Sequence, residues 1–130
     1  MLSTTVGSIG PCNASPDNTN NSGLAMIVSL LSGQSILLVG DADYEFLPGA
    51  LKGPIDGMVV THHGARFASS WTAIPKPNRA HSKCIVSYGK GNSYGHPHED
   101  AIDKHNSAGW RQIIPTAAFK GVARSDREFR

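Results

Sequence analysis

The stretch Ser35-Ile36-Leu37-Leu38-Val39-Gly40-Asp41-Ala42-Asp43 is the part of the chain that decides the fold. Its first half is a short, continuous apolar run, which is typical of a strand buried inside a sheet. Gly40 ends the run, and Asp41 is the next residue. Because parallel strands bring their C-terminal ends to one edge of a sheet, a carboxylate at this position can meet side chains from neighbouring strand ends. The stretch therefore indicates a sheet with a polar site along that edge.

The segments on either side predict the remaining elements. A second apolar run, residues 24–31, is separated from residues 35–39 by Ser32-Gly33-Gln34, which predicts a β-hairpin whose strands are buried on both faces. Further strands are expected over 57–61, 83–87 and 110–114, a short helix over 44–51 that Pro48 and Gly49 fray, a helical turn over 69–74, and a helix over 98–108. A hairpin followed by alternating helices and strands favours an α/β layered sheet.

The two ends of the chain differ in composition from the middle. Residues 7–23 are rich in Gly, Pro, Asn and Ser and are expected to form a loop, so residues 1–23 are interpreted as a loop-rich N-terminal segment. Residues 24–115 then form the folded part, and residues 116–130 form a charged tail that is frayed from Lys120 onward.

Composition restricts the class of protein. The 130 residues suit one domain, and a hydrophobic fraction of 39% is enough to form a core. The net charge of +2 is spread along the sequence, so nucleic-acid binding is neither required nor excluded. Cys12 and Cys84 show no zinc-knuckle or disulfide spacing. No apolar run is long enough to cross a bilayer and the start lacks a basic signal-peptide region, so we expect a soluble, cytoplasmic protein without a membrane partner.

Two histidines follow the predicted strand over 57–61, in Thr61-His62-His63-Gly64. An acid at one strand end and histidines at the next are typical of a metal site. Neighbouring strand residues face opposite sides, so only one of the pair is expected to be a ligand. Each feature also has a structural interpretation, because Asp41 can serve as a turn former and a histidine can simply pack. Asp43 is the better N-cap for the following helix, which leaves Asp41 to point over the edge.

A third polar cluster is the glycine-rich loop that follows the predicted strand over 83–87. It contains Tyr94-Gly95-His96-Pro97-His98. In a functional interpretation His96 projects toward the same edge as Asp41 and His63 and helps to bind a substrate or its leaving group. In a structural interpretation the glycines serve turns and the histidines begin the next helix. His81 and His105 have no partner pattern, and no role is assigned to them.

Together these motifs resemble the metallo-β-lactamase superfamily, and within it the soluble hydrolase domain of ComEC-type DNA-uptake proteins and their stand-alone relatives. The resemblance covers about residues 17–114, which correspond to the C-terminal half of such a domain. The motifs that carry it are Asp17-Asn18-Thr19-Asn20-Asn21-Ser22, Leu38-Val39-Gly40-Asp41-Ala42, His62-His63-Gly64 with Ser69-Ser70, and Ser87-Tyr88-Gly89 through Asn92-Ser93-Tyr94-Gly95-His96-Pro97.

The resemblance implies an αββα sandwich with one or two zinc ions at the edge between its two sheets. Asp41 would then be the aspartate that bridges or ligates the metal, and His63 the last histidine ligand. His62 would face the substrate and steady the developing oxyanion, and the loop that contains His96 would line the cleft. The implied reaction is attack by metal-bound hydroxide on a phosphodiester or other ester.

The family's primary ligand motif, His-x-His-x-Asp-His, has no counterpart before Asp41, and two protein donors are too few for zinc. We therefore expect the chain to be inactive alone and to need an N-terminal half of the same fold or self-association. Three hypotheses follow, in this order of preference. The chain is a hydrolase half, a catalytically silent interaction module that retains the sheet, or a nucleic-acid-binding module.

Overall fold

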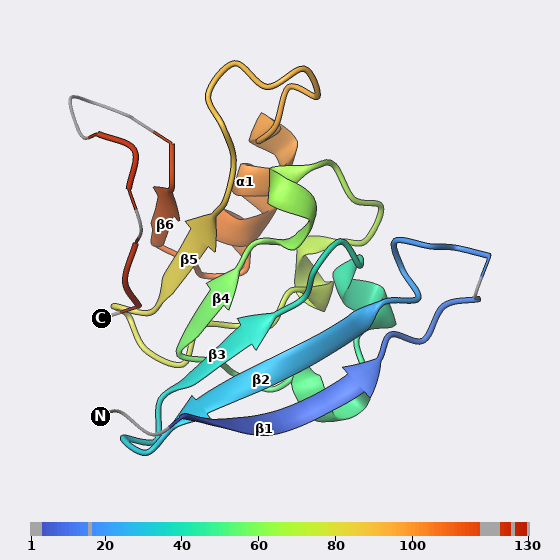
Figure 1. Cartoon of the computed structure of the whole chain (residues 1–130), viewed down its shortest axis with the longest axis vertical. Helices are drawn as coiled ribbons and strands as arrows, with labels where there is room; N and C mark the ends of the chain where they lie inside the picture. The colour runs from blue at the N-terminus through green and yellow to red at the C-terminus, as the bar shows by residue number, and fades with distance from the viewer. Residues whose placement is uncertain (1–3, 16, 118–122, 126, 130) are drawn as a thin grey trace.

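The computed structural model describes residues 4–15, 17–117, 123–125 and 127–129, and it has one mixed sheet. The six strands lie in the sheet in the order of the sequence (Figure 1). They are β1 (Thr4–Pro11), β2 (Leu24–Leu30), β3 (Ser35–Leu38), β4 (Gly57–Val59), β5 (Lys83–Val86) and β6 (Gln112–Pro115). The helices are α1 (Glu99–Ser107) and the 3-10 turns η1 (Tyr44–Phe46), η2 (Gly49–Leu51), η3 (Thr61–Gly64) and η4 (Trp71–Ala73).

The sheet changes from antiparallel to parallel pairing at β3. Strands β1, β2 and β3 form an antiparallel meander, whereas β3, β4, β5 and β6 run parallel to one another. Parallel neighbours need crossover connections, and the helical segments between these strands provide them. The prediction of an α/β fold is therefore confirmed, as is the hairpin made by β2 and β3.

The predicted helices agree in position with the structure, but one is interrupted. Pro48 separates η1 from η2, so residues 44–51 form two single turns instead of one helix. The helix expected over 98–108 is α1, with His98 at its N-cap position. The hairpin strands are less buried than expected, since Leu24 at the start of β2 is 60% exposed.

The prediction of a loop over residues 7–23 is wrong for its first part, because β1 extends from Thr4 to Pro11. This strand contains Gly7, Gly10 and Pro11, which weaken a strand in the middle of a sheet. β1 tolerates them because it is an edge strand, and because its register with β2 shifts between Val6 and Ser8, where Gly7 lies in a bulge.

The expectation of a frayed tail is wrong for residues 127–129. The Gln34 side-chain amide donates to the Phe129 carbonyl oxygen at 3.0 Å, and the Lys83 ammonium donates to the Glu128 carbonyl oxygen at 3.4 Å. The Phe129 ring lies so close over Gly57 that a β-carbon there would be 2.5 Å from its Cδ1 atom. Residues 118–122, 126 and 130 lie outside the described residues.

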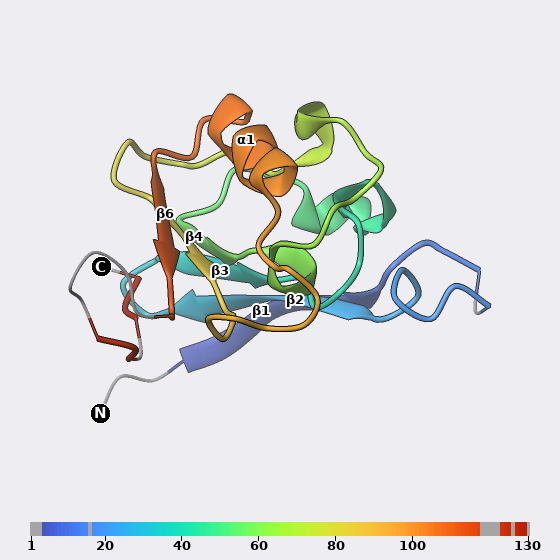
Figure 2. The same cartoon turned by 90° about the horizontal axis from the view of Figure 1, so that it is seen from above.

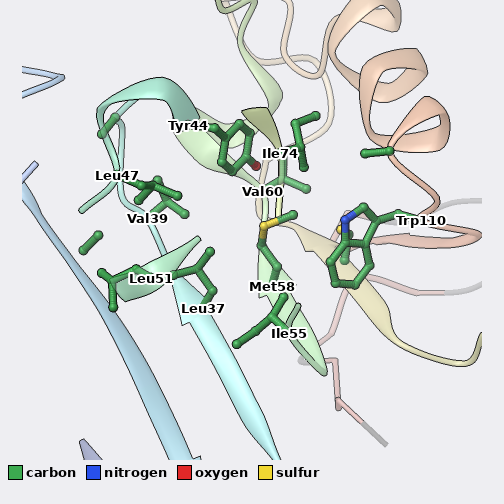
Figure 3. Close-up of a cluster of buried hydrophobic side chains, with 14 of the residues drawn as sticks. Leu37, Val39, Tyr44, Leu47, Leu51, Ile55, Met58, Val60, Ile74 and Trp110 are labelled. Atoms are coloured by element: carbon green, nitrogen blue, oxygen red, sulfur yellow. The ribbon is translucent and has the colours of Figure 1, made fainter. Parts of the chain in front are cut away.

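The helices lie over one face of the sheet, and the hydrophobic core fills the space between them (Figure 2). Figure 3 shows Leu37 and Met58 pointing from the sheet toward Tyr44 and Trp110. All four side chains are fully buried, and the Trp110 indole donates to the Pro75 carbonyl oxygen at 2.9 Å. This layer fixes the strand ends that carry the polar clusters.

The opposite face of the sheet also has apolar side chains. Alternation along β3 and β4 directs Leu38 and Val59 away from the core that contains their neighbours Leu37 and Met58. Cross-strand pairing then aligns one row of side chains on this face, which we call the apolar row: Met26, Leu38, Val59, Ile85 and Ile114. In the part of the chain that the structure describes, no helix covers this row (Figure 2). The same described residues contain no helix with the length and apolar character of a membrane span.

Candidate functional site

The three polar clusters of the sequence lie at the carboxyl ends of the parallel strands. Asp41 follows β3, the turn η3 with His62 and His63 follows β4, and the loop with His96 follows β5 (Figure 1). These strands are neighbours in the sheet, so their ends meet along one edge. We call this region the strand-end site.

The histidine pair has an unusual backbone. His62 and His63 have φ values of 45° and 56°, so both adopt the left-handed conformation inside η3. The expectation that they face opposite sides of a strand is therefore wrong, because they lie in a turn. Each left-handed non-glycine residue costs about 1–2 kcal/mol, and such strain gathers at functional sites. The turn is held by a hydrogen bond from the His62 amide to the Gly40 carbonyl oxygen at 2.9 Å.

One nitrogen of His63 is fixed by the protein. Its Nδ1 atom lies 2.7 Å from the carbonyl oxygen of Ser87. A carbonyl oxygen only accepts hydrogen bonds, so Nδ1 carries the proton and Nε2 keeps its lone pair. Histidine ligands of metals are typically oriented in this way, by a hydrogen bond from the second ring nitrogen. The exposed His63 ring thus has the tautomer that a metal ligand needs.

Further imidazoles surround this pair. The ring centroid of His96 lies 5.7 Å from that of His62 and 5.6 Å from that of His98, while the centroids of His62 and His63 are 6.5 Å apart. Partial burial lowers the pKa of His96, the three neighbouring imidazoles lower it further, and the charge of Asp41 opposes this shift. Asp41 and three histidines therefore lie close enough to His96 to act on its charge.

Gly64 joins the two histidine segments. Its φ is +81°, and a β-carbon would lie 2.5 Å from the Pro97 Cβ atom. Its carbonyl oxygen accepts a hydrogen bond from the His98 amide at 2.9 Å. Only glycine combines this backbone conformation with so close an approach. Gly64 therefore allows the chain to turn sharply beside the site.

The loop that carries His96 is braced by Asn92. Its side-chain amide donates to the carbonyl oxygens of Gly89 and His96, at 2.9 Å and 2.6 Å, and its Oδ1 atom accepts from the His96 amide at 3.0 Å. The Tyr94 ring, which is 78% exposed, stacks on the His96 ring with a centroid distance of 5.7 Å. Asn92 thus holds the backbone of His96, and Tyr94 packs against its imidazole.

Asp43 has a different role from the expected one. It stands at the N-cap position of η1, but its carboxylate makes no hydrogen bond to that turn. It accepts instead from the Ser69 amide at 2.9 Å and from the Ser69 hydroxyl, and its own amide donates to Asn21 Oδ1 at 2.7 Å. Asp43 therefore ties together three segments, while Asp41 is exposed at the edge.

Two hollows flank the histidines. The larger, about 460 Å³, is lined by Asp41, His62 and Arg66 together with asparagines of the 18–21 loop, and we call it the asparagine cleft. The smaller, about 280 Å³, is lined by His63, His96 and Arg124, among others. Sequence reasoning missed both arginines, because an isolated arginine carries no motif.

The donors at the strand-end site fit zinc only in part. Imidazole nitrogen and carboxylate oxygen are both suitable ligands, and His63 presents the correct lone pair. Among the residues that the structure describes, however, no three His, Cys, Asp or Glu side chains gather into a group that could hold a metal ion. The chain supplies Asp41 and His63 as candidate donors, and the expectation that another segment completes the site stays a prediction.

Sequence reasoning also missed His105, which lies beneath the site. It is fully buried, and its Nε2 atom lies 2.6 Å from the hydroxyl oxygen of Tyr44. Desolvation by burial lowers its pKa to about 4, an effect that a hydrogen bond to the backbone at Ala101 opposes. The only signal in the sequence was its place beside alanines and Ile102 on the apolar side of α1, which does not reveal a partner from η1.

In comparisons with known proteins, no family model, no curated protein and no solved structure matches the chain.

Proposed function

We propose that this chain is one half of a metal-dependent hydrolase with the metallo-β-lactamase fold, acting on a phosphodiester or other ester. The observation that carries the proposal is the strand-end site. One carboxylate and four imidazoles interact there, and the Ser87 carbonyl group holds His63 in the tautomer of a metal ligand. A cleft of about 460 Å³ opens beside Asp41 and His62, which leaves room for a substrate.

In this proposal Asp41 and His63 hold zinc together with donors from another segment. Zinc, when bound, supplies a Lewis acid that neutralises charge and lowers the pKa of water. His62 borders the asparagine cleft, where its imidazole N–H group donates to a developing oxyanion. Burial and the neighbouring imidazoles lower the pKa of His96 and so favour its neutral form, in which one ring nitrogen donates to the substrate or its leaving group.

The apolar row supports the same proposal from the opposite face of the sheet. Leu38 and Val59 belong to this row, and they precede Asp41 and His62 by only three residues each. In an αββα sandwich a second sheet packs on this face, and the metal lies at the edge between the two sheets. A second layer over the row would therefore deliver its own ligands to the strand-end site.

The test is a zinc titration of the purified chain against a chelating dye. We expect weak binding, because a two-donor site is incomplete, and we expect Asp41→Ala and His63→Ala each to weaken it further by at least about tenfold. His81→Gln is the matched control, since His81 is exposed and outside the site. Tight, stoichiometric zinc in the unmodified chain, or zinc binding that neither site variant changes, would contradict the proposal.

The second step adds a polypeptide that carries the His-x-His-x-Asp-His motif of such a domain. The chain alone should not hydrolyse bis-p-nitrophenyl phosphate, whereas the mixture should bind zinc tightly and hydrolyse it. Asp41→Ala should abolish metal uptake by the mixture.

The alternative is a catalytically silent interaction module, favoured by the apolar row, which no helix of the described residues covers. In that case Asp41→Ala should leave partner binding unchanged, and the mixture should show no metal-dependent activity.

A further inference from the structure

A line of buried hydrogen bonds runs from α1 to the strand-end site, and we call it the buried relay. Its members are His105 on α1, Tyr44 on η1 and Thr61 at the start of η3. All three side chains are at most 1% exposed. Burying polar groups is costly unless they are paired, and this line pairs each of them.

The direction of each hydrogen bond follows from its ends. His105 Nδ1 lies 2.6 Å from the Ala101 carbonyl oxygen, which only accepts, so Nδ1 carries the proton. His105 Nε2 is then an acceptor, and the Tyr44 hydroxyl donates to it at 2.6 Å. The Tyr44 oxygen in turn accepts from the Thr61 amide at 3.2 Å. Each hydrogen bond of the relay therefore has a defined direction.

Thr61 connects the buried relay to the ends of β3 and β4. Its hydroxyl lies 2.6 Å from the Ala42 carbonyl oxygen and 3.2 Å from that of Gly40, the two residues that flank Asp41. The next residue, His62, donates its amide to Gly40 as well, at 2.9 Å. One buried threonine thus connects the segment that bears the acid with the turn that bears the histidines.

We propose that Tyr44 and His105 are positioning residues, which hold Thr61 from within the core and so keep Asp41 and the strained His62-His63 turn in place for metal binding. The statement about metal rests on the proposed function, whereas the statement about position does not. The turn needs such support because two successive left-handed residues relax when their hydrogen bonds are lost.

The experiment compares Tyr44→Phe, the double variant Tyr44→Phe/His105→Leu, and the control Ile55→Val. Phenylalanine keeps the ring and removes only the hydroxyl. The double variant also removes the imidazole, so no ring nitrogen is left unpaired in the core and the Thr61 amide is the relay group that loses its partner. Ile55 is a core residue, 2% exposed, with no part in the relay, so its variant reports a loss of packing alone.

The first readout is amide hydrogen exchange in the whole chain without metal. In both tyrosine variants we expect exchange at Thr61 and His62 to accelerate at least about tenfold more than exchange at Met58 and Ile85 in the sheet. Ile55→Val should change all four amides in parallel. Equal acceleration at all four amides in the double variant, or none at Thr61, would overturn the proposal.

The second readout is Zn²⁺ affinity, measured with Zn²⁺ alone. Both tyrosine variants should bind at least about tenfold more weakly than the unmodified chain. If the unmodified chain shows no zinc binding while exchange responds as expected, the positioning role holds and the proposed function fails. A double variant with unmodified zinc affinity would overturn the link between the relay and the metal.

Discussion

His105 makes the stability of the fold depend on pH in a way that can be calculated. The imidazole is fully buried and neutral, and burial lowers its pKa from 6.5 to about 4. In the unfolded chain the same group takes up a proton near pH 6.5. Between these two values the unfolded state binds more protons than the folded state, so stability is present above pH 6.5 and is lost as the pH falls toward 4.

The size of the effect follows from the two pKa values. They differ by about 2.5 units, and each unit corresponds to about 1.4 kcal/mol, so the folded state loses about 3 kcal/mol between pH 7 and pH 4 through this group. Below pH 4 the folded state takes up the proton too, and the loss levels off. A marginally stable domain has only about 5–15 kcal/mol in total, so this loss is a substantial part of it.

The assay is urea unfolding, followed by tryptophan fluorescence at pH 7, 6, 5 and 4. Trp110 is fully buried and reports the transition. His105→Gln removes the titrating group, so the difference in unfolding free energy between the unmodified chain and this variant should shift by about 3 kcal/mol in favour of the variant from pH 7 to pH 4. The exposed control His81→Gln should run parallel to the unmodified chain. If the unfolding free energy of His105→Gln also changes with pH in parallel with that of the unmodified chain, the conclusion that His105 is buried and neutral is refuted.

Two further predictions concern packing. Gly64→Ala should lower the free energy of unfolding by about 2–4 kcal/mol, because it adds a close contact with Pro97 to the strain of a positive φ. Gly91→Ala is the control, since Gly91 has φ +73° but no atom within 4 Å, and it should cost only about 1 kcal/mol. Equal losses in urea unfolding would refute the close contact. Burial raises the pKa of the Cys84 thiol well above its usual value. Cys84 should therefore resist iodoacetamide at pH 8 in the folded chain and react after unfolding. Labelling of Cys84 in the folded chain, detected by mass spectrometry, would contradict this.

Local patterns in the sequence were sufficient to predict the sheet around β3. A continuous apolar run, a glycine and an acid describe a strand and its end within nine residues, and the structure has β3 followed by Asp41 there. The same reasoning predicted β4 and β5 and the gathering of Asp41, His62, His63 and His96 at one edge. These features were predictable because parallel strands in one sheet all place their carboxyl ends at the same edge.

Features that depend on contacts distant in sequence were not predictable. The role of His105 depends on Tyr44, 61 residues away, and nothing in either local pattern indicates the other. The contact of Phe129 with Gly57 is of the same kind. The left-handed turn at His62 and His63 escaped prediction for a different reason, because local propensity disfavours it and only the surrounding hydrogen bonds maintain it.

Under the proposed function, the ligand count and the apolar row are two independent reasons to expect a second layer that also brings metal ligands. The first comes from metal chemistry, since Asp41 and His63 are too few donors for zinc. The second comes from the far face of the sheet, where no helix of the described residues covers the apolar row, although Ile85 is buried and the other members of the row are half-buried. Leu38 and Val59 lie in that row three residues before the site, so a layer that covers them ends beside Asp41 and η3. A partner that buried the row without adding ligands would satisfy only the second requirement, and zinc affinity in the mixture separates these two cases.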